Sequence, residues 1–178
     1  KNKKINKINI GAQNCHPKDK FGSNTGAISS YMIKNLKSKY VIIGHSDNRA
    51  EGDSDKLLKD KVSAALKNNL KIIFCIGENK QQKLKNLTLV TLKKQILKFI
   101  EKKFYKNKII VAYEPIWSIG TGKIPSTKEL LIVTKHIKQI LGKIFKSRNI
   151  PKVLYGGSVD SSNIIQFQAL PEIDGFLI

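Results

Sequence analysis

The sequence predicts an α/β fold in which strands and helices alternate along one domain of 178 residues. Short runs rich in Val and Ile indicate buried strands, and each is followed by a segment with apolar residues at helical spacing. Strands that alternate with helices pair in parallel through right-handed crossovers. No linker and no repeat beyond this βα unit interrupts the pattern, so residues 1–178 are expected to form a single domain.

The predicted strands are short runs that stop at polar or glycine-containing segments. They cover residues 8–12, 40–43, 72–76, 109–112, 153–155 and 175–178. The five predicted helices lie between these strands and carry apolar residues at spacings of three and four. They cover residues 27–36, a segment around 57–66 that Asp53 or Ser54 can cap, 88–104, 130–145 and 163–170.

The charge of the chain is its unusual bulk property, with 33 Lys and Arg against 13 Asp and Glu and a net charge of +20. Such a surface suits nucleic acid, an anionic membrane or an anionic substrate. However, the only arginines are Arg49 and Arg148, and the lysines are scattered through every segment. Because readers of bases and phosphates rely on the planar fork of arginine, we favour an AT-rich genome as the source of the charge.

Cysteine usage and hydropathy favour a cytoplasmic protein. Cys15 and Cys75 stand in dissimilar contexts without metal-ligand spacing, so neither a disulfide framework nor a metal site is expected. The sequence shows no signal peptide and no apolar run long enough to span a bilayer. We therefore expect no membrane partner.

The most informative stretch joins the strand at 109–112 to the helix at 130–145. Glu114 stands at the carboxyl end of the strand, and Pro115 ends the strand pairing because proline has no N–H. A carboxylate before a loop with a rigid start and a glycine-rich finish is typical of a base beneath a mobile lid. The alternative is an ordinary βα loop beside a salt-bridged glutamate. The expected lid comprises Pro115, Ile116, Trp117, Ser118, Ile119, Gly120, Thr121, Gly122 and Lys123.

Four segments, each at the end of a predicted strand, carry a resemblance to a known enzyme family. They are GAQN at 11–14, YVIIGHS at 40–46, AYEPIWSIGTGK at 112–123 and LYGGSV at 154–159. From residue 10 to residue 178 the chain resembles triosephosphate isomerase. The resemblance implies a (β/α)8 TIM barrel, which takes about 250 residues. We therefore expect a partial barrel that covers about strands 3 to 8 and is incomplete at both ends.

The resemblance implies interconversion of dihydroxyacetone phosphate and glyceraldehyde 3-phosphate through an enediolate, without cofactor or metal. It makes Glu114 the general base and His45 a neutral electrophile that hydrogen-bonds to the substrate oxygens. Ser46 is expected to cap or orient the next segment, Asp47 to support it, and Cys75 to pack near Glu114 as a small buried group. This family is a standard example of pKa tuning, so these roles come from the resemblance.

Phosphate binding is expected from backbone N–H groups. The resemblance assigns it to Gly156, Gly157 and Ser158, which follow the fifth predicted strand, with Gly120 of the lid closing over the same group. Small residues let the main chain approach an anion closely, and helix N-termini favour negative charge.

The chain departs from the family pattern in places. The Asn-x-Lys signature and the second phosphate-binding Gly-Gly are absent from the sequence. The family has Glu where this chain has Asp47. It has Glu and Arg where this chain has Ala27 and Asn48, and that Glu and Arg pair across the family's dimer interface. Both halves of this ion pair are therefore missing. We still expect a homodimer through the projecting loop at 14–26, in which Thr25 reaches furthest toward the partner's site. The isolated chain is expected to be inactive.

Two other functions stay open on the sequence. One is a non-catalytic remnant that keeps the barrel for binding or assembly. The other is a basic nucleic-acid-binding protein on the same scaffold, because fold does not fix function. Salt-dependent binding of DNA would favour the second alternative. We favour the enzyme, because all four segments occur in order at strand ends, and we expect no nucleic-acid partner.

Overall fold

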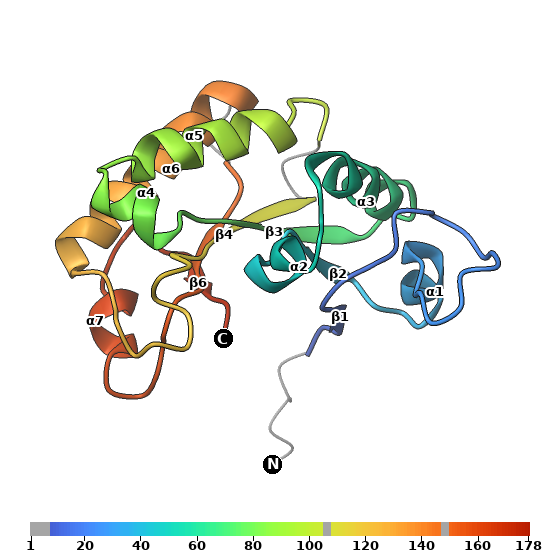
Figure 1. The fold of residues 1–178 in the computed structure, drawn as a ribbon, viewed down its shortest axis with the longest axis horizontal. Coiled ribbons are helices and arrows are strands. Elements are labelled where there is room, and N and C mark those ends of the chain that lie inside the picture. Colours follow the sequence, from blue (N-terminus) through green and yellow to red (C-terminus); the bar gives the residue numbers. More distant parts are fainter. Residues whose placement is uncertain (1–7, 105–107, 147–149) are drawn as a thin grey trace, which may run out of the picture.

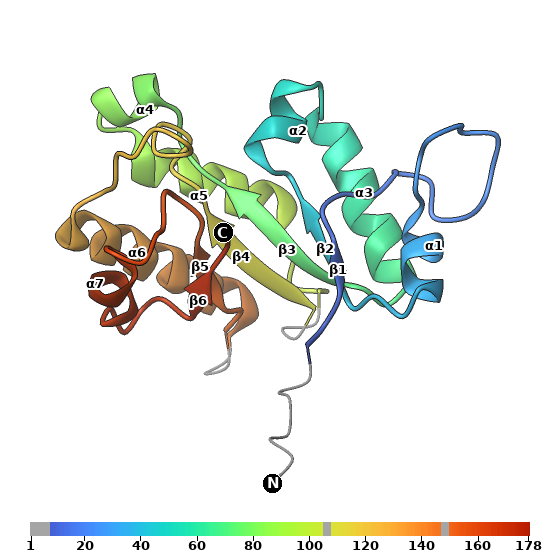
Figure 2. The same ribbon diagram turned by 90° about the horizontal axis from the view of Figure 1, so that it is seen from below.

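The computed structural model describes residues 8–104, 108–146 and 150–178, so Arg148 lies outside the described residues. One sheet holds the strands β1 Gly11–Ala12, β2 Tyr40–Ile43, β3 Lys71–Ile76, β4 Ile109–Tyr113, β5 Val153–Tyr155 and β6 Gly175–Phe176. The helices are α1 Ser30–Asn35, α2 Ser46–Ala50, α3 Asp55–Lys67, α4 Lys80–Leu84, α5 Thr88–Phe99, α6 Thr127–Phe145 and α7 Ile164–Gln168. The sheet is curled, and α3, α5 and α6 lie on one side of it (Figure 1, Figure 2).

The strands lie in the sheet in the order in which they occur along the chain, and every neighbouring pair is parallel. The loops that follow the strands therefore meet at one edge of the sheet, which is where α/β proteins place their ligands. The predicted α/β class is confirmed, in the form of a partial TIM barrel of six parallel strands.

Aliphatic and aromatic side chains fill the space between the sheet and its helices. Val41, Phe74 and Val111 of the central strands are at most 1% exposed, and Leu92 and Ile137 of the helices are fully buried. Burying a side chain of this size stabilises the fold by about 1.5–3 kcal/mol relative to leaving it exposed. This core fixes the strands, and with them the loops at the carboxyl edge of the sheet.

The predicted strands agree with the structure in the centre of the sheet and are too long at its edges. β2 and β5 cover the predicted residues, and β3 and β4 are each one residue longer. β1 and β6 contain two residues each, fewer than the predicted 8–12 and 175–178. Ile8 and Ile10 are 82% and 64% exposed, so they lack the burial that would extend β1.

The helices differ from the prediction in number and in length. α1 begins three residues later than predicted, because the Ser29 side chain accepts the N–H of Met32 and caps the helix there. α5 ends at Phe99 rather than at residue 104, because Ile100 adopts an extended conformation. α2 and α4 are absent from the prediction, since neither contains a buried residue and no apolar stripe marks them.

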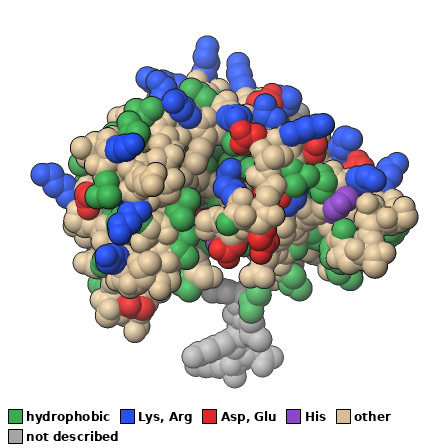
Figure 3. All heavy atoms as spheres, in the orientation of Figure 1, with side chains coloured by type: hydrophobic (Ala, Val, Ile, Leu, Met, Phe, Trp, Pro, Cys, Tyr) green, Lys and Arg blue, Asp and Glu red, His purple; other side chains and the backbone are tan. Residues whose placement is uncertain are grey.

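Basic side chains are widely spread over the surface. Figure 3 shows Lys and Arg dispersed across the face that it presents, without a single basic patch. Arg49 is half-buried near the carboxyl edge of the sheet and so contributes little to this surface. None of the described helices has both the length and the apolar character that crossing a membrane requires.

Candidate active site

A cavity of about 480 Å³ opens where the strands end, between the loops that follow β1, β2, β4, β5 and β6. Its wall includes Asn14, His45, Asp47, Glu114, Ile119 and Ser158. A larger hollow of about 680 Å³ lies between α3 and α5, and its lining includes none of the predicted catalytic residues. The smaller cavity is therefore the candidate active site.

The Glu114 side chain lies at the carboxyl end of β4 with only 3% of its surface exposed. Burial raises the pKa of this carboxyl group, because water no longer stabilises the charged form. Four neighbours oppose the rise by favouring the carboxylate: the Cys75 thiol, the His45 ring, the N–H of Ser46 and the Arg49 guanidinium. The pKa of Glu114 stays above its ordinary value, which makes the carboxylate a stronger base.

The His45 ring faces Glu114 across the end of β3, with its Nε2 3.5 Å from Oε1 of the carboxylate. Its Nδ1 accepts the N–H of Asp47 at 3.3 Å, so the His45 side chain caps α2. The Asp47 carboxylate also lies 3.4 Å from Nδ1. A ring that accepts the Asp47 N–H through Nδ1 carries its proton on Nε2, the nitrogen on the side of Glu114. Ser46, which was predicted to cap or orient this segment, is the first residue of α2, and its N–H is near enough to Glu114 to favour the ionised carboxylate.

Close contacts require the two glycines after β5. A Cβ on Gly156 would lie 3.0 Å from Cγ of Glu114, and one on Gly157 would lie 2.2 Å from the Tyr155 hydroxyl. The N–H of Gly156 donates to the carbonyl of Tyr113 at 2.8 Å and continues the sheet pairing. In this structure that N–H is therefore not available to phosphate, contrary to the prediction. A side chain at position 156 would crowd the Glu114 side chain.

The lid, residues 115–123, is a compact loop held by its own hydrogen bonds. Gly120 and Gly122 have φ values of +64° and +70°, in the left-handed region that glycine adopts without strain. The Ser118 hydroxyl donates to the carbonyl of Lys123 at 2.5 Å, which joins the two arms of the loop. β4 ends before the lid begins, as the proline at its start predicts.

Ser158 connects the lid to the loop after β5. Its hydroxyl donates to the carbonyl of Ser118 at 2.7 Å, and its N–H points at the Ser118 hydroxyl oxygen at 3.4 Å. The residue predicted to bind phosphate thus contacts the lid directly.

The sequence analysis missed the residues that hold Trp117 of the lid. The indole N–H donates to Oε1 of Glu78 at 2.8 Å, and the Tyr113 hydroxyl donates to the same oxygen at 3.2 Å. Lys83 of α4 lies over the indole ring at 5.3 Å and pairs with Glu129 of α6 at 2.7 Å, which lowers the pKa of Glu129 to about 2. The position of Glu78, two residues after the end of β3, is a signal that could have identified it, whereas nothing in the sequence marks Lys83.

Arg49 was also missed, although the sequence contains only one other arginine, Arg148. Its Nε donates to the carbonyl of Gly44 at 2.8 Å and its Nη2 to that of Cys75 at 3.1 Å. Its guanidinium also lies over the rings of Phe74 and Phe99. Arg49 therefore ties the loop after β2 to the end of β3, close to Glu114.

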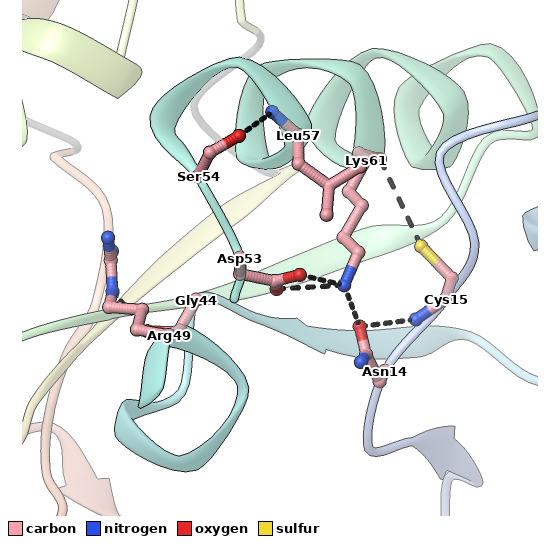
Figure 4. A network of polar contacts seen from close by, with 8 residues as sticks. All are labelled: Asn14, Cys15, Gly44, Arg49, Asp53, Ser54, Leu57 and Lys61. Atoms are coloured by element: carbon pink, nitrogen blue, oxygen red, sulfur yellow. Dashed lines mark hydrogen bonds and ion pairs between the residues drawn. The ribbon is translucent and has the colours of Figure 1, made fainter. Parts of the chain in front are cut away.

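A buried polar network holds Asn14 at the rim of the cavity (Figure 4). Nζ of Lys61 lies 2.7 Å from Oδ1 of Asp53 and 3.0 Å from Oδ1 of Asn14, and the side chains of the ion pair are only 6% and 7% exposed. The N–H of Cys15 donates to the same Asn14 oxygen, and burial raises the pKa of the Cys15 thiol to about 11. Of the two predicted caps of α3, Ser54 is the one used, and Asp53 pairs with Lys61 instead.

The loop at 14–26 projects from the molecule beside α1 (Figure 2). The N–H of His16 donates to the carbonyl of Ile28 at 2.8 Å and holds the base of the loop. Phe21 is 70% exposed and packs edge-on against Tyr31 at 5.0 Å. The exposed aromatic ring is the type of apolar surface that protein interfaces cover.

The profile of the family described as triosephosphate isomerase matches residues 1–178. The chain belongs to the triosephosphate isomerase family. It is 39% identical over 177 residues to the triosephosphate isomerase of Finegoldia magna, across 96% of this chain and 70% of the relative. It is 38% identical over 173 residues to that of Bradyrhizobium sp. (strain ORS 278), across 96% of this chain and 68% of the relative. It is 40% identical over 176 residues to the triosephosphate isomerase of Ruthia magnifica, across 96% of this chain and 70% of the relative.

Membership of the triosephosphate isomerase family makes the protein an isomerase, so the predicted family and enzyme class are confirmed. The chain spans about two thirds to 70% of the length of these relatives. Of the family departures, Asn48 lines the active-site cavity, whereas Ala27 lies at the base of the projecting loop.

Proposed function

We propose that this triosephosphate isomerase uses Glu114 as its general base and His45 as its electrophile. The observation that supports the assignment is the buried Glu114 carboxylate, which lies 3.5 Å from Nε2 of His45 on the wall of the cavity. One group accepts a proton and the other donates a hydrogen bond, and both reach the same small volume. Moving a proton between adjacent carbons is redox-neutral overall, so the reaction needs no electron donor or acceptor.

Glu114 removes a proton from the carbon next to the substrate carbonyl. The C–H electron pair becomes the C=C bond of the enediolate, and the carbonyl oxygen takes up the negative charge. The protonated Glu114 then returns the proton to the neighbouring carbon, while a second proton moves between the two oxygens. A carboxyl group whose pKa burial has raised serves both halves of this cycle, because it holds the proton more readily between them.

His45 stabilises the charge that develops on the substrate oxygens. Its Nε2–H, beside Glu114 on the cavity wall, donates to the enediolate, and a donor fixed in advance costs no reorganisation. The N–H of Asp47 holds the ring in this tautomer through Nδ1. The hydrogen bond between Asp47 and the ring is thus the supporting role of Asp47, and Cys75 supports Glu114 from the buried side.

Phosphate is bound by the N–H groups of Gly157 and Ser158, with Gly120 of the lid covering it. Ser158 is already in the cavity wall, and Gly157 has no side chain to keep an anion away from the main chain. Gly156 is left out of the donor set because its N–H pairs with Tyr113.

The full-length protein is proposed to be a cytoplasmic homodimer that pairs through the loop at 14–26. The exposed Phe21 and the loop's projection beside α1 support an interface there. We propose no nucleic-acid or membrane partner, since the basic side chains are dispersed on the face in Figure 3. Sedimentation of the full-length protein as a monomer at high micromolar concentration would contradict the dimer.

The substitution Glu114→Gln in the full-length protein tests the assignment. It keeps the size of the side chain and removes the base, so we expect kcat for triose phosphate isomerisation to fall about a thousandfold with little change in KM. Glu101→Gln is the matched control, because Glu101 is a surface carboxylate that pairs with Lys103 and is expected to leave kcat unchanged. Activity of Glu114→Gln within tenfold of the parent would refute the role of Glu114.

A further inference from the structure

The hollow between α3 and α5 has no part in the proposed reaction. Its volume of about 680 Å³ lies within the range of about 300–1,000 Å³ that is usual for small-molecule sites. Asn69 and Lys108 line it and stand just before β3 and β4, so it reaches the amino ends of these strands. The candidate active site lies at the carboxyl ends. The α3–α5 hollow is therefore a separate place on the molecule.

Part of the wall of the α3–α5 hollow is apolar. Val62 and Phe99 are each 4% exposed, and Phe104 is 9% exposed. Leu66, which follows Val62 by about one turn of α3, is half-buried in the same wall. An aliphatic chain or a ring placed against these side chains would be stabilised, because its apolar surface leaves water.

The polar part of the wall is mainly basic. Five lysines line the hollow, against the two carboxylates of Asp60 and Glu101. The lysines are Lys59, Lys67, Lys98, Lys103 and Lys108. An excess of positive charge beside apolar surface favours a ligand that is anionic at one end and apolar along the rest.

The lysines differ in whether a carboxylate of the protein already pairs with them. Three of them have such a partner: Lys67 pairs with Asp19 at 3.4 Å, Lys103 with Glu101 at 2.8 Å, and Lys98 with Asp55. Among the described residues, neither Lys59 nor Lys108 is within ion-pair distance of a carboxylate. Two ammonium groups on the wall can therefore take an anion from outside.

Lys108 is the better placed of these two lysines, because it is half-buried and Lys59 is exposed. Its carbonyl accepts the N–H of Ile72 at 2.7 Å, which holds its main chain beside β3. Its Nζ donates to Oδ1 of Asn69, and the NH2 group of the same amide can donate to a ligand. An ammonium and an amide NH2 group side by side match the two oxygens of a carboxylate.

We propose that the α3–α5 hollow binds an amphiphilic carboxylate of the fatty-acid type. The carboxylate accepts hydrogen bonds from Lys108 and Asn69, and the apolar chain covers the side chains of Val62, Phe99 and Phe104. Binding involves no covalent step. The site is independent of the proposed function, so its ligand does not compete with triose phosphate.

Calorimetric titration of the full-length protein with dodecanoate, below the concentration at which it forms micelles, tests the proposal. Dodecyltrimethylammonium has an equally long chain with the opposite charge, and acetate has the carboxylate without the chain. We expect dodecanoate to bind about tenfold more tightly than either, because only dodecanoate satisfies both parts of the wall. Absence of dodecanoate binding would overturn the proposal, as would equal affinity for dodecyltrimethylammonium.

Two variants place the bound dodecanoate in this hollow. Lys108→Gln removes the cation, and loss of a hydrogen bond to a charged group is expected to weaken binding about tenfold. Ser63→Phe puts a ring into the hollow from an exposed position on α3 and is expected to weaken binding by at least about as much. Both variants are expected to keep the kcat and KM of the parent.

Lys128→Gln is the matched control, because Lys128 is an exposed lysine of α6 outside the hollow and its loss changes the net charge equally. It is expected to bind dodecanoate as the parent does. If Ser63→Phe does not fold, Lys108→Gln decides the result. A folded variant of either kind that binds dodecanoate as tightly as the parent would overturn the assignment. The same would follow if Lys128→Gln weakened binding as much as Lys108→Gln.

Discussion

Replacing Lys61 by methionine is expected to destabilise the protein strongly. Nζ of Lys61 lies 2.7 and 2.8 Å from the two oxygens of Asp53, and both side chains are more than nine-tenths buried. Methionine fills a similar volume but supplies no charge. Lys61→Met therefore leaves the Asp53 carboxylate inside the protein without its cation, and Asn14 loses the same donor.

The size of the effect follows from this burial. Removing one partner of a buried ion pair costs about 3–5 kcal/mol, because the other charge stays desolvated. In a chain of this length each kcal/mol shifts the melting temperature by about 2–4 °C, so a fall of about 6–20 °C is expected. The exposed pair Lys103–Glu101, with side chains 70% and 52% exposed, contributes less than about 1 kcal/mol. Lys103→Met is therefore the matched control.

The assay is thermal unfolding of the full-length variants at one protein concentration, followed by circular dichroism. The double variant Lys61→Met, Asp53→Leu removes both charges together and is expected to recover most of the lost stability. A fall of less than 2 °C for Lys61→Met would refute the reasoning. So would a double variant that is less stable than Lys61→Met by itself.

Three further predictions concern catalysis and the isolated chain. Glu114→Asp withdraws the carboxylate by about 1 Å and is expected to lower kcat about a hundredfold, and steady-state activity within a few-fold of the parent would contradict this. Because burial raises the pKa of Glu114 above 4.5, and the base must be ionised, kcat/KM should fall as pH drops through that raised value. A profile that stays level down to pH 4.5 would be the contrary result. Residues 1–178 expressed alone are expected to show trace activity and to scatter more light as salt screens the charge of +20, because β1 and β6 pair on one side only among the described residues. A monomeric, fully active sample would contradict that expectation.

The sequence predicts the centre of this fold well because burial decides it. β2 and β5 are short runs of aliphatic and aromatic residues flanked by lysine and glycine, and their bounds can be read directly. α2 and α4 could not be found this way, because their ends are set by hydrogen bonds. The His45 side chain caps α2, and Asn79 and Gln82 form a capping box on α4. Neither helix buries a residue, so hydrophobic periodicity does not mark them.

The sequence predicts which strand-end residues make up the candidate site, but it does not predict the hydrogen bonds between them. Glu114 and His45 follow parallel strands of one sheet, so their meeting at its carboxyl edge follows from the topology. The contacts depend on where individual donors point. Two of them were therefore not predictable: the His45 side chain caps α2, and the Gly156 N–H donates to the carbonyl of Tyr113. A sequence pattern names a glycine-rich loop without showing which of its N–H groups are already used.

The contact between His45 and Glu114 also needs an explanation, because the two residues follow strands that are not neighbours. β3 lies between β2 and β4, and strands two apart in a sheet are separated by about 9.5 Å. The space above the end of β3 must therefore be free of side chains and the sheet must curl there. Gly77 allows the main chains to approach closely, since a Cβ at this position would lie 1.7 Å from the carbonyl oxygen of Glu114.

The main chain at Gly77 must still satisfy its own polar groups while Glu114 approaches so closely. Gln95 of α5 does this with both ends of its amide, accepting the Gly77 N–H at 2.9 Å and donating to the Gly77 carbonyl at 2.9 Å. A helix side chain thus replaces the strand partners that β3 loses at its end. The glycine that follows β3 lets the main chain of Glu114 approach closely, and the glutamine on the covering helix holds that glycine in place.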